Sequence, residues 1–543
     1  MLDDSTVTAS ETERNTLMVM KMRRVALSAV ALLALLLTAE LHAQDASRPS
    51  QQQAQGSRTR DRAAASPSSS PVPTTEASTE FRKLPPDSTT KHTLALAGRT
   101  LNFTATAGTI RLYTEKGEPQ ADIAVTAYQL DGADAATRPV TFFFNGGPGA
   151  SSAWLQFGAA GPWRLNMGGQ PLSPSASAEV LPNEQTWLDF TDLVFVDPVG
   201  TGYSRFVATG DDVRRHFYSV DGDVSTLALT VRRWLEKADR LRSPKYIVGE
   251  SYGGIRGPRI ARNLQADQGI GIKGLILVSP LFDYRDFTGS SLLQYAYRLP
   301  TMAAIAREAK RTPGQADVTR ADMADAETYA TTDYVADLIK GEADTEATTR
   351  LADKVAAMTG LDVAVSRRLA GRLDAGEFRR EFDRKDGKVI GRYDGSVSGF
   401  DPFPDSSTSG AGDPSLQPLL APLTTAAVDT YQHKLNWRAE GSYEVLNGAV
   451  GNAWDFGRDR SGTESLTQLR QILAADPAMK LLVAHGLFDL ATPYFGSKVA
   501  LDQLPPTYAR DRIKLVVYPG GHMFYTRDAP RQALRSEAEA LIK

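Results

Sequence analysis

Cysteine is absent from the 543-residue sequence. Disulfide bonds, thiolate metal sites and a cysteine nucleophile are therefore all excluded. A secreted eukaryotic protein of this length more often carries disulfides, so the absence fits an exported bacterial protein better. No pattern in the sequence indicates a metal ion or an organic cofactor.

An excess of charge of either sign is also absent. The chain has 61 Lys and Arg residues against 64 Asp and Glu residues, which gives a formal net charge of −3. Because no strong basic field is available to hold phosphate groups, we do not expect nucleic acid as a partner. Hydrophobic residues make up 42% and charged residues 23%. These values are typical of a globular chain with one large domain and an insertion, or with two to three modules.

The apolar run near the N-terminus is short for a transmembrane helix. Val25–Ala39 has 15 residues, whereas a membrane span needs about 20. Three basic residues precede the run, and Leu41-His42-Ala43 offers a cleavage site after it. This layout predicts a signal peptide within residues 1–43, preceded by a polar extension. We therefore expect export to the periplasm or the medium, with no stable membrane span after processing. An uncleaved anchor is the alternative.

Residues 44–86 are rich in Ser, Gln, Ala, Thr and Pro, and they contain the run Ser66-Pro67-Ser68-Ser69-Ser70-Pro71. Such a segment buries too little apolar surface to offset the entropy cost of ordering it. We expect a disordered linker that tethers the folded part.

Continuous apolar runs, each followed by turn or polar residues, recur in the folded part. They are Val140–Phe144, Leu193–Val196, Tyr246–Val248, Leu275–Val278, Met479–Ala484 and Ile513–Tyr518, and alternating segments near His92 and at Thr109–Tyr113 precede them. Runs that are apolar on both sides are typical of parallel strands covered by helices on both faces. A helix predicted over Ile255–Ala266 lies between two of these runs and completes a β-α-β unit.

The pattern changes after the fourth apolar run. Polar, Ala-rich helical stretches at Thr301–Lys310, Ala321–Ala336 and Thr348–Ala375 alternate with a Gly-, Ser- and Pro-rich piece at Ser396–Pro414. We expect a mainly helical cap over residues 283–456, inserted into an α/β domain whose two parts are residues 87–282 and 457–543. A last helix is predicted over Ala529–Ile542.

Gly249-Glu250-Ser251-Tyr252-Gly253 matches the nucleophile-elbow pattern of α/β hydrolases, in which glycines stand two residues before and after a serine. The turn is too tight for side chains at the glycine positions, and it presents the serine at the end of a strand. A strand is predicted before this segment and a helix after it. The segment therefore predicts a serine nucleophile at Ser251, with a simple glycine-rich turn as the alternative.

A serine nucleophile needs a base and a group that orients the base. Of the six histidines, His522 stands out because Pro519-Gly520-Gly521 brings it off a strand onto a loop. The other five fit the cleavage site, the start of the domain, exposed positions or a strand end: His42, His92, His216, His433 and His485. Asp489 follows the predicted strand Met479–Ala484, and the order Ser251, Asp489, His522 is the chain order of α/β hydrolases. We therefore predict the α/β-hydrolase fold, with these three residues as the catalytic triad.

Five blocks of the sequence resemble the serine carboxypeptidase family and occur in that family's order. They are Asn145–Ser152, Val196–Ser204, Gly249–Gly254, Gly486–Gly496 and Gly520–Met523. The cap between the third and fourth blocks matches less clearly. The resemblance implies a bacterial-type member of the family, with Ser251 as nucleophile, His522 as base and Asp489 as the residue that orients the base.

The resemblance also implies the remaining site residues. The backbone amides of Gly147 and Tyr252 would form the oxyanion hole, where a glycine loop and the residue after the nucleophile aim at one oxygen atom. Asn145 and Glu250 would bind the C-terminal carboxylate of a substrate. Taken alone, Asn145 also suits a turn and Glu250 a helix start.

Two positions depart from the family pattern. Phe143 stands where relatives often carry a Trp whose indole N–H helps to hold the carboxylate. Ala159 stands where we align a second glutamate of the family. These departures leave catalysis intact, but they put a strict requirement for a free C-terminal carboxylate in question. Arg164 is a candidate to compensate, although a surface arginine is the simpler interpretation.

The sequence therefore predicts an exported serine carboxypeptidase that acts on peptides with a free C-terminus through an acyl-enzyme on Ser251. An esterase or acyltransferase with the same triad is the first alternative, because the fold does not fix the substrate. A non-catalytic binding protein of the cell envelope is the second. The side-chain preference, the physiological substrate and the oligomeric state stay open.

Overall fold

The computed structural model of the chain describes residues 83–167, 173–287, 291–314, 317–406, 410, 412–457 and 463–543. These residues all belong to one compact unit, Thr75–Lys543. The predicted signal peptide and most of the predicted linker lie outside the described residues. Within the described ranges, no helix has the length and the apolar character needed to cross a membrane.

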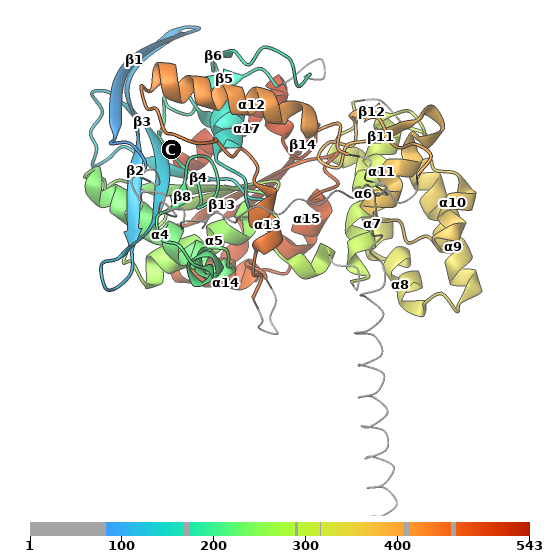
Figure 1. The fold of residues 1–543 in the computed structure, drawn as a ribbon. Coiled ribbons are helices and arrows are strands. Elements are labelled where there is room, and N and C mark those ends of the chain that lie inside the picture. Colours follow the sequence, from blue (N-terminus) through green and yellow to red (C-terminus); the bar gives the residue numbers. More distant parts are fainter. Residues whose placement is uncertain are drawn as a thin grey trace, which may run out of the picture. The chain divides into compact units, whose positions relative to one another are not determined.

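One large sheet forms the centre of this unit (Figure 1). Its strands lie in the order β1 (Ser88–Leu96), β2 (Arg99–Tyr113), β3 (Pro119–Leu130), β7 (Asp192–Val196), β4 (Val140–Phe144), β9 (Lys245–Glu250), β10 (Gly274–Val278), β13 (Lys480–Gly486) and β14 (Ile513–Tyr518). From β7 to β14 all neighbouring strands run parallel, whereas β1, β2, β3 and β7 pair antiparallel. The six parallel strands confirm the apolar runs predicted from the sequence.

Helices cover both faces of the sheet, which explains why its central strands are apolar on both sides. Alternate residues of β4 enter two different cores. One core is shared with α4 (Val220–Lys237) and α5 (Gly253–Ala266), and the other with α12 (Gln417–Asp429) and α17 (Asp528–Ile542). This is the predicted α/β-hydrolase fold, and its parallel strands direct their carboxyl ends to one edge of the sheet.

A group of helices between β10 and β13 forms a cap with a hydrophobic core of its own (Figure 1). It contains α6 (Leu293–Glu308), α7 (Ala324–Thr331), α8 (Asp333–Lys340), α9 (Thr345–Thr359), α10 (Val363–Arg368) and α11 (Ala375–Phe382). The cap core also includes Leu487, Phe488 and Leu490. The core of the cap thus extends to the loop that carries Asp489.

Two of the helical stretches predicted for the cap each contain more than one helix in the structure. The helical stretch predicted over 321–336 breaks at Thr332, between α7 and α8. The stretch predicted over 348–375 breaks at Gly360, whose φ of +65° is the left-handed conformation of a helix C-terminus. Asp362 then caps the start of α10 with its side chain.

Candidate active site

Ser251 occupies a sharp turn between β9 and α5. Its φ of +62° lies in the left-handed region, which residues other than glycine rarely adopt. A Cβ atom at Gly249 would clash with the carbonyl group of Gly253, which explains the flanking glycine. The turn therefore has the strand–turn–helix context of a nucleophile elbow, and the Ser251 residue stays partly exposed.

Asp489 and His522 are in direct contact. The Asp489 Oδ2 atom lies 2.7 Å from His522 Nδ1, and both side chains are buried. The other carboxylate oxygen accepts hydrogen bonds from the backbone amides of Ala491 (2.8 Å) and Thr492 (3.0 Å). Burial disfavours the charged imidazolium, but the charge of Asp489 and its hydrogen bond outweigh burial, so the pKa of His522 is raised above its ordinary value.

Thr492 is a third member of this contact that the sequence analysis did not identify. Its hydroxyl oxygen lies 2.7 Å from Asp489 Oδ2, 3.0 Å from His522 Nδ1 and 2.9 Å from the Ser279 carbonyl oxygen. A hydroxyl group has one proton to donate, so it serves one acceptor at a time. Its place three residues after the acid, where side chains of a turn reach back, is the signal that could have found it.

The end of β10 connects the serine loop to the histidine loop. The Val278 carbonyl oxygen accepts a hydrogen bond from the Ser251 amide (3.0 Å), and the Ser279 hydroxyl donates to the His522 carbonyl oxygen (2.8 Å). The carboxyl ends of parallel strands are the usual place for functional residues in open α/β sheets. The structure brings Ser251, Asp489 and His522 to this edge, on the segments that follow β9, β13 and β14.

A short cap segment, residues 392–395, bonds to both the acid loop and the base loop. The Tyr393 carbonyl oxygen accepts a hydrogen bond from the His522 amide (2.5 Å). The first and last residues of the segment bond to the backbones of Leu490 (3.1 Å) and Phe488 (2.9 Å), which flank the acid. We call this segment the cap clasp. The sequence analysis gave it no role, because backbone hydrogen bonds of this kind leave no residue pattern.

The loop after β4 lies against the nucleophile turn. A Cβ atom at Gly146 would stand 2.5 Å from the Tyr252 nitrogen and 2.9 Å from the Ser251 Cβ atom, so only glycine permits this approach. Gly147 follows with a φ of +101°. Among the described residues, the backbone amides of Gly147 and Tyr252 have no hydrogen-bond acceptor. Both donors can therefore bind an oxygen atom of a ligand.

Arg256, a buried residue of α5, bonds to the same loop. Its guanidinium group donates to the Asn145 carbonyl oxygen and to both carboxylate oxygens of Asp223, at 2.7 and 3.1 Å. It also lies 5.2 Å from the centre of the Tyr252 ring. The buried ion pair thus supports Tyr252, which carries one candidate oxyanion donor, and Asn145, which begins the loop that leads to the other. The sequence analysis missed Arg256, since arginines are rarely buried without a partner that only the fold supplies.

Glu250, the last residue of β9, is buried and bonds to two neutral side chains. The Tyr525 hydroxyl donates to Glu250 Oε2 at 2.9 Å, and the Asn145 side chain forms the second hydrogen bond. Burial disfavours the carboxylate and raises the pKa of Glu250 to about 7, although His522 and both hydrogen bonds oppose the shift. The structure thus brings Asn145 and Glu250 together, and it adds Tyr525, which the sequence analysis did not identify.

Neither Phe143 nor Ala159 places a polar side-chain atom beside this acid. Phe143 is buried in β4 and stacks on another aromatic ring at 4.5 Å between centroids. Ala159 is buried in a π-helical turn, Gln156–Ala160. Arg164 pairs with Asp528 at 3.9 Å, so its acidic partner belongs to α17 and is not the buried glutamate.

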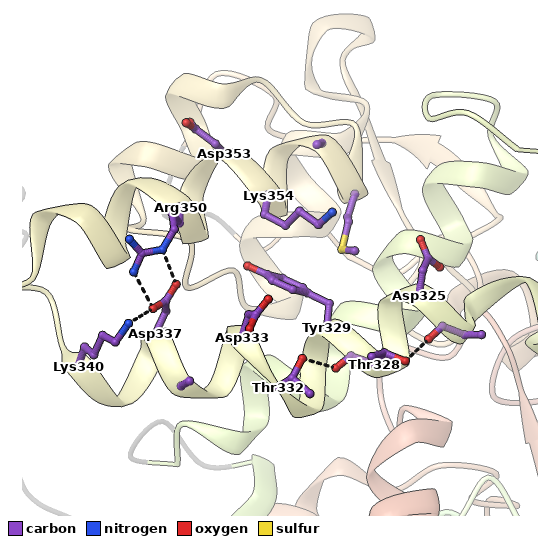
Figure 2. A pocket seen from close by; sticks show the side chains of 14 residues that line it. Asp325, Thr328, Tyr329, Thr332, Asp333, Asp337, Lys340, Arg350, Asp353 and Lys354 are labelled. Atoms are coloured by element: carbon purple, nitrogen blue, oxygen red, sulfur yellow. Dashed lines mark hydrogen bonds and ion pairs between the residues drawn. The ribbon is translucent and has the colours of Figure 1, made fainter.

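A large hollow lies in the cap, away from these residues (Figure 2). It has a volume of about 1330 Å³ and is lined by residues of α7, α8 and α9. Figure 2 shows Asp337 bonded there to Lys340 (2.6 Å) and Arg350 (2.9 Å). None of the candidate catalytic residues lines this hollow. We therefore assign the chemistry to the sheet edge.

Known proteins resemble the chain over its central part. The sequence model of the serine carboxypeptidase family matches residues 127–382. Serine carboxypeptidase-like 33 of Arabidopsis thaliana is 29% identical over 174 residues, which cover 30% of this chain and 34% of that relative. Pheromone-processing carboxypeptidase KEX1 of Yarrowia lipolytica is 24% identical over 371 residues, or 68% of this chain and 52% of that relative. The chain thus spans about a third to a half of the length of these curated relatives.

A solved structure shares the fold. The crystal structure of KEX1ΔP, a prohormone-processing carboxypeptidase from Saccharomyces cerevisiae, gives a TM-score of 0.53 at 16% identity, and the match covers 81% of this chain and 91% of that one. The family match ends at residue 382, yet the later blocks Gly486–Gly496 and Gly520–Met523 fold onto the same sheet edge as Ser251. The chain is thus similar to the serine carboxypeptidase family in sequence over residues 127–382, and it shares the fold of KEX1ΔP.

Proposed function

We propose that this protein is a serine carboxypeptidase that hydrolyses C-terminal peptide bonds through an acyl-enzyme on Ser251. The buried 2.7 Å contact between Asp489 and His522, at the sheet edge that also carries Ser251, is the observation that supports this most directly. Relatives named as carboxypeptidases support the same class of reaction.

In the proposed reaction, neutral His522 accepts the hydroxyl proton of Ser251 at Nε2 while the serine oxygen attacks the scissile carbonyl carbon. Asp489 accepts the hydrogen bond from Nδ1–H, which selects the tautomer and stabilises the imidazolium. The tetrahedral intermediate collapses when His522 protonates the leaving amine, and the C-terminal amino acid departs. Water then loses a proton to His522 and attacks the ester carbonyl carbon. The ester bond breaks as His522 returns this proton to the Ser251 oxygen, and the shortened peptide is released.

The negative oxygen of the intermediate needs donors that are already in place. The free backbone amides of Gly147 and Tyr252 serve this purpose in our proposal, and the loss of one such donor typically costs about 2.7–4 kcal/mol of barrier. Arg256 holds the loop that leads to Gly147 by its bond to the Asn145 carbonyl oxygen.

Asn145 and Glu250 are the proposed partners of the substrate's C-terminal carboxylate. Two carboxylates in one buried site do not both ionise, so the substrate and Glu250 share one proton. The pKa of Glu250, raised to about 7, keeps that proton available in mildly acidic solution.

Export is part of the same proposal. The basic, apolar and small-residue segments within residues 1–43 support a cleaved signal and a periplasmic or secreted enzyme. Mass spectrometry of the native protein is expected to find a mature N-terminus near Gln44. An intact chain recovered from the cytosol would contradict export.

An esterase or acyltransferase is the second candidate, and one observation favours it. Phe143 and Ala159 give the carboxylate site fewer polar groups than the family pattern has.

A non-catalytic binding protein would leave Ser251 unreactive toward a fluorophosphonate, whereas both enzymes would be labelled at that residue.

A matched pair of substrates tests the main proposal. The pair is a blocked dipeptide with a free C-terminal carboxylate and the same dipeptide as its C-terminal amide. We expect kcat/KM to be higher for the free acid in mildly acidic solution. If simple esters are hydrolysed and the free acid is not, with Ser251→Ala inactive in both assays, the esterase proposal replaces this one.

A further inference from the structure

Tyr525 lies between the candidate base and the candidate carboxylate site, and the reaction described so far does not use it. It belongs to a short 3₁₀ turn, Phe524–Thr526, that begins two residues after His522. Its side chain is fully buried, and Arg531 Nη1 donates a hydrogen bond to its carbonyl oxygen at 3.0 Å. The backbone of Tyr525 is therefore held independently of its side chain.

A glycine makes room for the tyrosine ring. A Cβ atom at Gly158 would lie 2.6 Å from Cε2 of Tyr525. Gly158 precedes Ala159 in the π-helical turn Gln156–Ala160. The phenol ring therefore packs next to the position at which the sequence departs from the family's second acid.

The hydroxyl group of this ring reaches Glu250, with 2.9 Å between the hydroxyl oxygen and Oε2. Burial raises the pKa of Tyr525 well above its ordinary value, so the group stays a neutral donor. A donor to the charged form of an acid stabilises that form. Tyr525 therefore opposes the burial effect that raises the pKa of Glu250.

We propose that Tyr525 is a specificity-determining residue of the carboxylate site: its hydroxyl group orients Glu250 toward the terminal carboxylate of a peptide and stands in for a second acid. This inference rests on the proposed carboxypeptidase function. It goes beyond that function because Tyr525 does not ionise, so that a single proton, the one on Glu250, controls carboxylate binding. A second acid at the carboxylate would add another coupled titration step, whereas Tyr525 adds none. His522 and Asp489, which also act on Glu250, are present in either case.

The sign of the pH dependence follows from the proton that is shared. Glu250 must hold its proton when a substrate carboxylate binds, so binding is strong below the pKa of Glu250 and is lost as pH rises through about 7. Removing the Tyr525 hydroxyl withdraws a donor from the charged form, which raises that pKa further. Binding of the free acid then persists to higher pH.

Tyr525→Phe tests the inference, because it keeps the ring that packs on Gly158 and removes only the hydroxyl group. KM is measured from mildly acidic to alkaline pH for the blocked dipeptide and for its amide. We expect the free-acid KM at acidic pH to rise about 3- to 10-fold relative to the amide KM, the loss typical of one hydrogen bond. Its alkaline rise should move upward by up to about one pH unit.

Tyr128→Phe is the matched control. Tyr128 is also fully buried, and its hydroxyl oxygen bonds to Gln156 of the same π-helical turn at 2.8 Å. This variant should leave the ratio of the two KM values and the pH midpoint at the wild-type values. A second test variant, Gly158→Ala, displaces the Tyr525 ring without removing its hydroxyl group, and it should raise the same KM ratio.

Glu250→Gln separates this inference from the proposed function. In one outcome, Glu250→Gln flattens the pH dependence of the free-acid KM, while Tyr525→Phe and Gly158→Ala leave the KM ratio of free acid to amide and the pH midpoint unchanged. The proposed carboxylate site then stands, and the inference about Tyr525 is wrong. If Glu250→Gln leaves the profile as in wild type, the carboxylate site fails and the inference fails with it. A shifted midpoint in Tyr525→Phe, with a wild-type unfolding temperature, supports the inference.

Discussion

Two buried carboxyl groups lie in one site of this protein, and their surroundings differ. Asp489 accepts hydrogen bonds from two backbone amides and from the Thr492 hydroxyl, and it contacts His522, which can carry a positive charge. Glu250 bonds to two neutral side chains, those of Tyr525 and Asn145. Both groups are almost completely removed from solvent.

The difference shows how one chemical group can take two roles a short distance apart. Many donors and a cationic partner favour a carboxylate, whereas burial with few donors favours the neutral acid. Asp489 is thus suited to hold and stabilise an imidazolium. Glu250, with a pKa of about 7, is suited to exchange a proton with its ligand near neutral pH.

The largest effect on kcat is expected for the two residues that react directly with the substrate, Ser251 and His522. Ser251→Ala and His522→Ala should each lower kcat by about 10⁶-fold, and the double variant by little more, because the two residues act as one unit. Turnover of a peptide and an ester is measured, with circular dichroism to check the fold. Near-normal turnover by folded Ser251→Ala would contradict the assignment.

Asp489→Asn should lower kcat by about 10⁴-fold, since the amide selects the wrong imidazole tautomer. Thr492→Val removes one of the donors to the same carboxylate, and we expect a smaller loss of about tenfold. Both variants are assayed on an amide or ester substrate, which has no free carboxylate. If Glu250→Gln impairs that substrate as severely as Asp489→Asn does, the two acids do not have the separate roles proposed here.

A third buried carboxyl group, that of Asp223, extends the contrast because a full ion pair with Arg256 supports it. Arg256→Met should lower the free energy of unfolding by about 3–5 kcal/mol, since the charge of Asp223 is left unpaired. Denaturant unfolding measures this loss. Combining it with Asp223→Leu should restore part of the stability. If the double variant loses as much as the two single variants together, the residues are not coupled in the way the structure indicates.

The smallest effect, and the most specific, is a difference between two pH profiles. For the amide, kcat/KM should rise with pH and level off above the pKa of His522, which, against the effect of burial, Asp489 raises above its ordinary value, because the base must be neutral. For the free acid, kcat/KM should also fall as pH rises through the pKa of Glu250, about 7. The apparent values belong to the coupled pair. In Glu250→Gln, the alkaline fall should disappear for the free acid, and a fall that persists would exclude Glu250 as its cause.

The parallel sheet could be predicted from the sequence because a strand covered on both faces must be apolar throughout. The site could be located for a related reason. Tight turns leave room only for glycine, so Gly146 and Gly249 mark the places where the backbone passes close to another segment. The order of Ser251, Asp489 and His522 then follows from the topology of the sheet.

Arg256 and Tyr525 could not be predicted, since their roles arise from contacts between distant segments. Arg256 is buried only because Asp223 and the Asn145 carbonyl oxygen meet it there. Tyr525 reaches Glu250 across 275 positions of the chain.

The cap clasp, residues 392–395, connects the cap to the two loops that carry Asp489 and His522. The positions of these loops therefore depend on the inserted cap. Residues 392–395 form backbone hydrogen bonds with the His522 loop on one side and with the loop around Asp489 on the other. The Tyr393 ring also packs against the His522 ring, and Asp394 pairs with Arg527 at 3.0 Å. The cap is therefore not an exchangeable module: a cap transplanted from a relative would have to reproduce this four-residue path to keep the triad aligned. The alignment of acid and base therefore depends on the path of the cap backbone through residues 392–395.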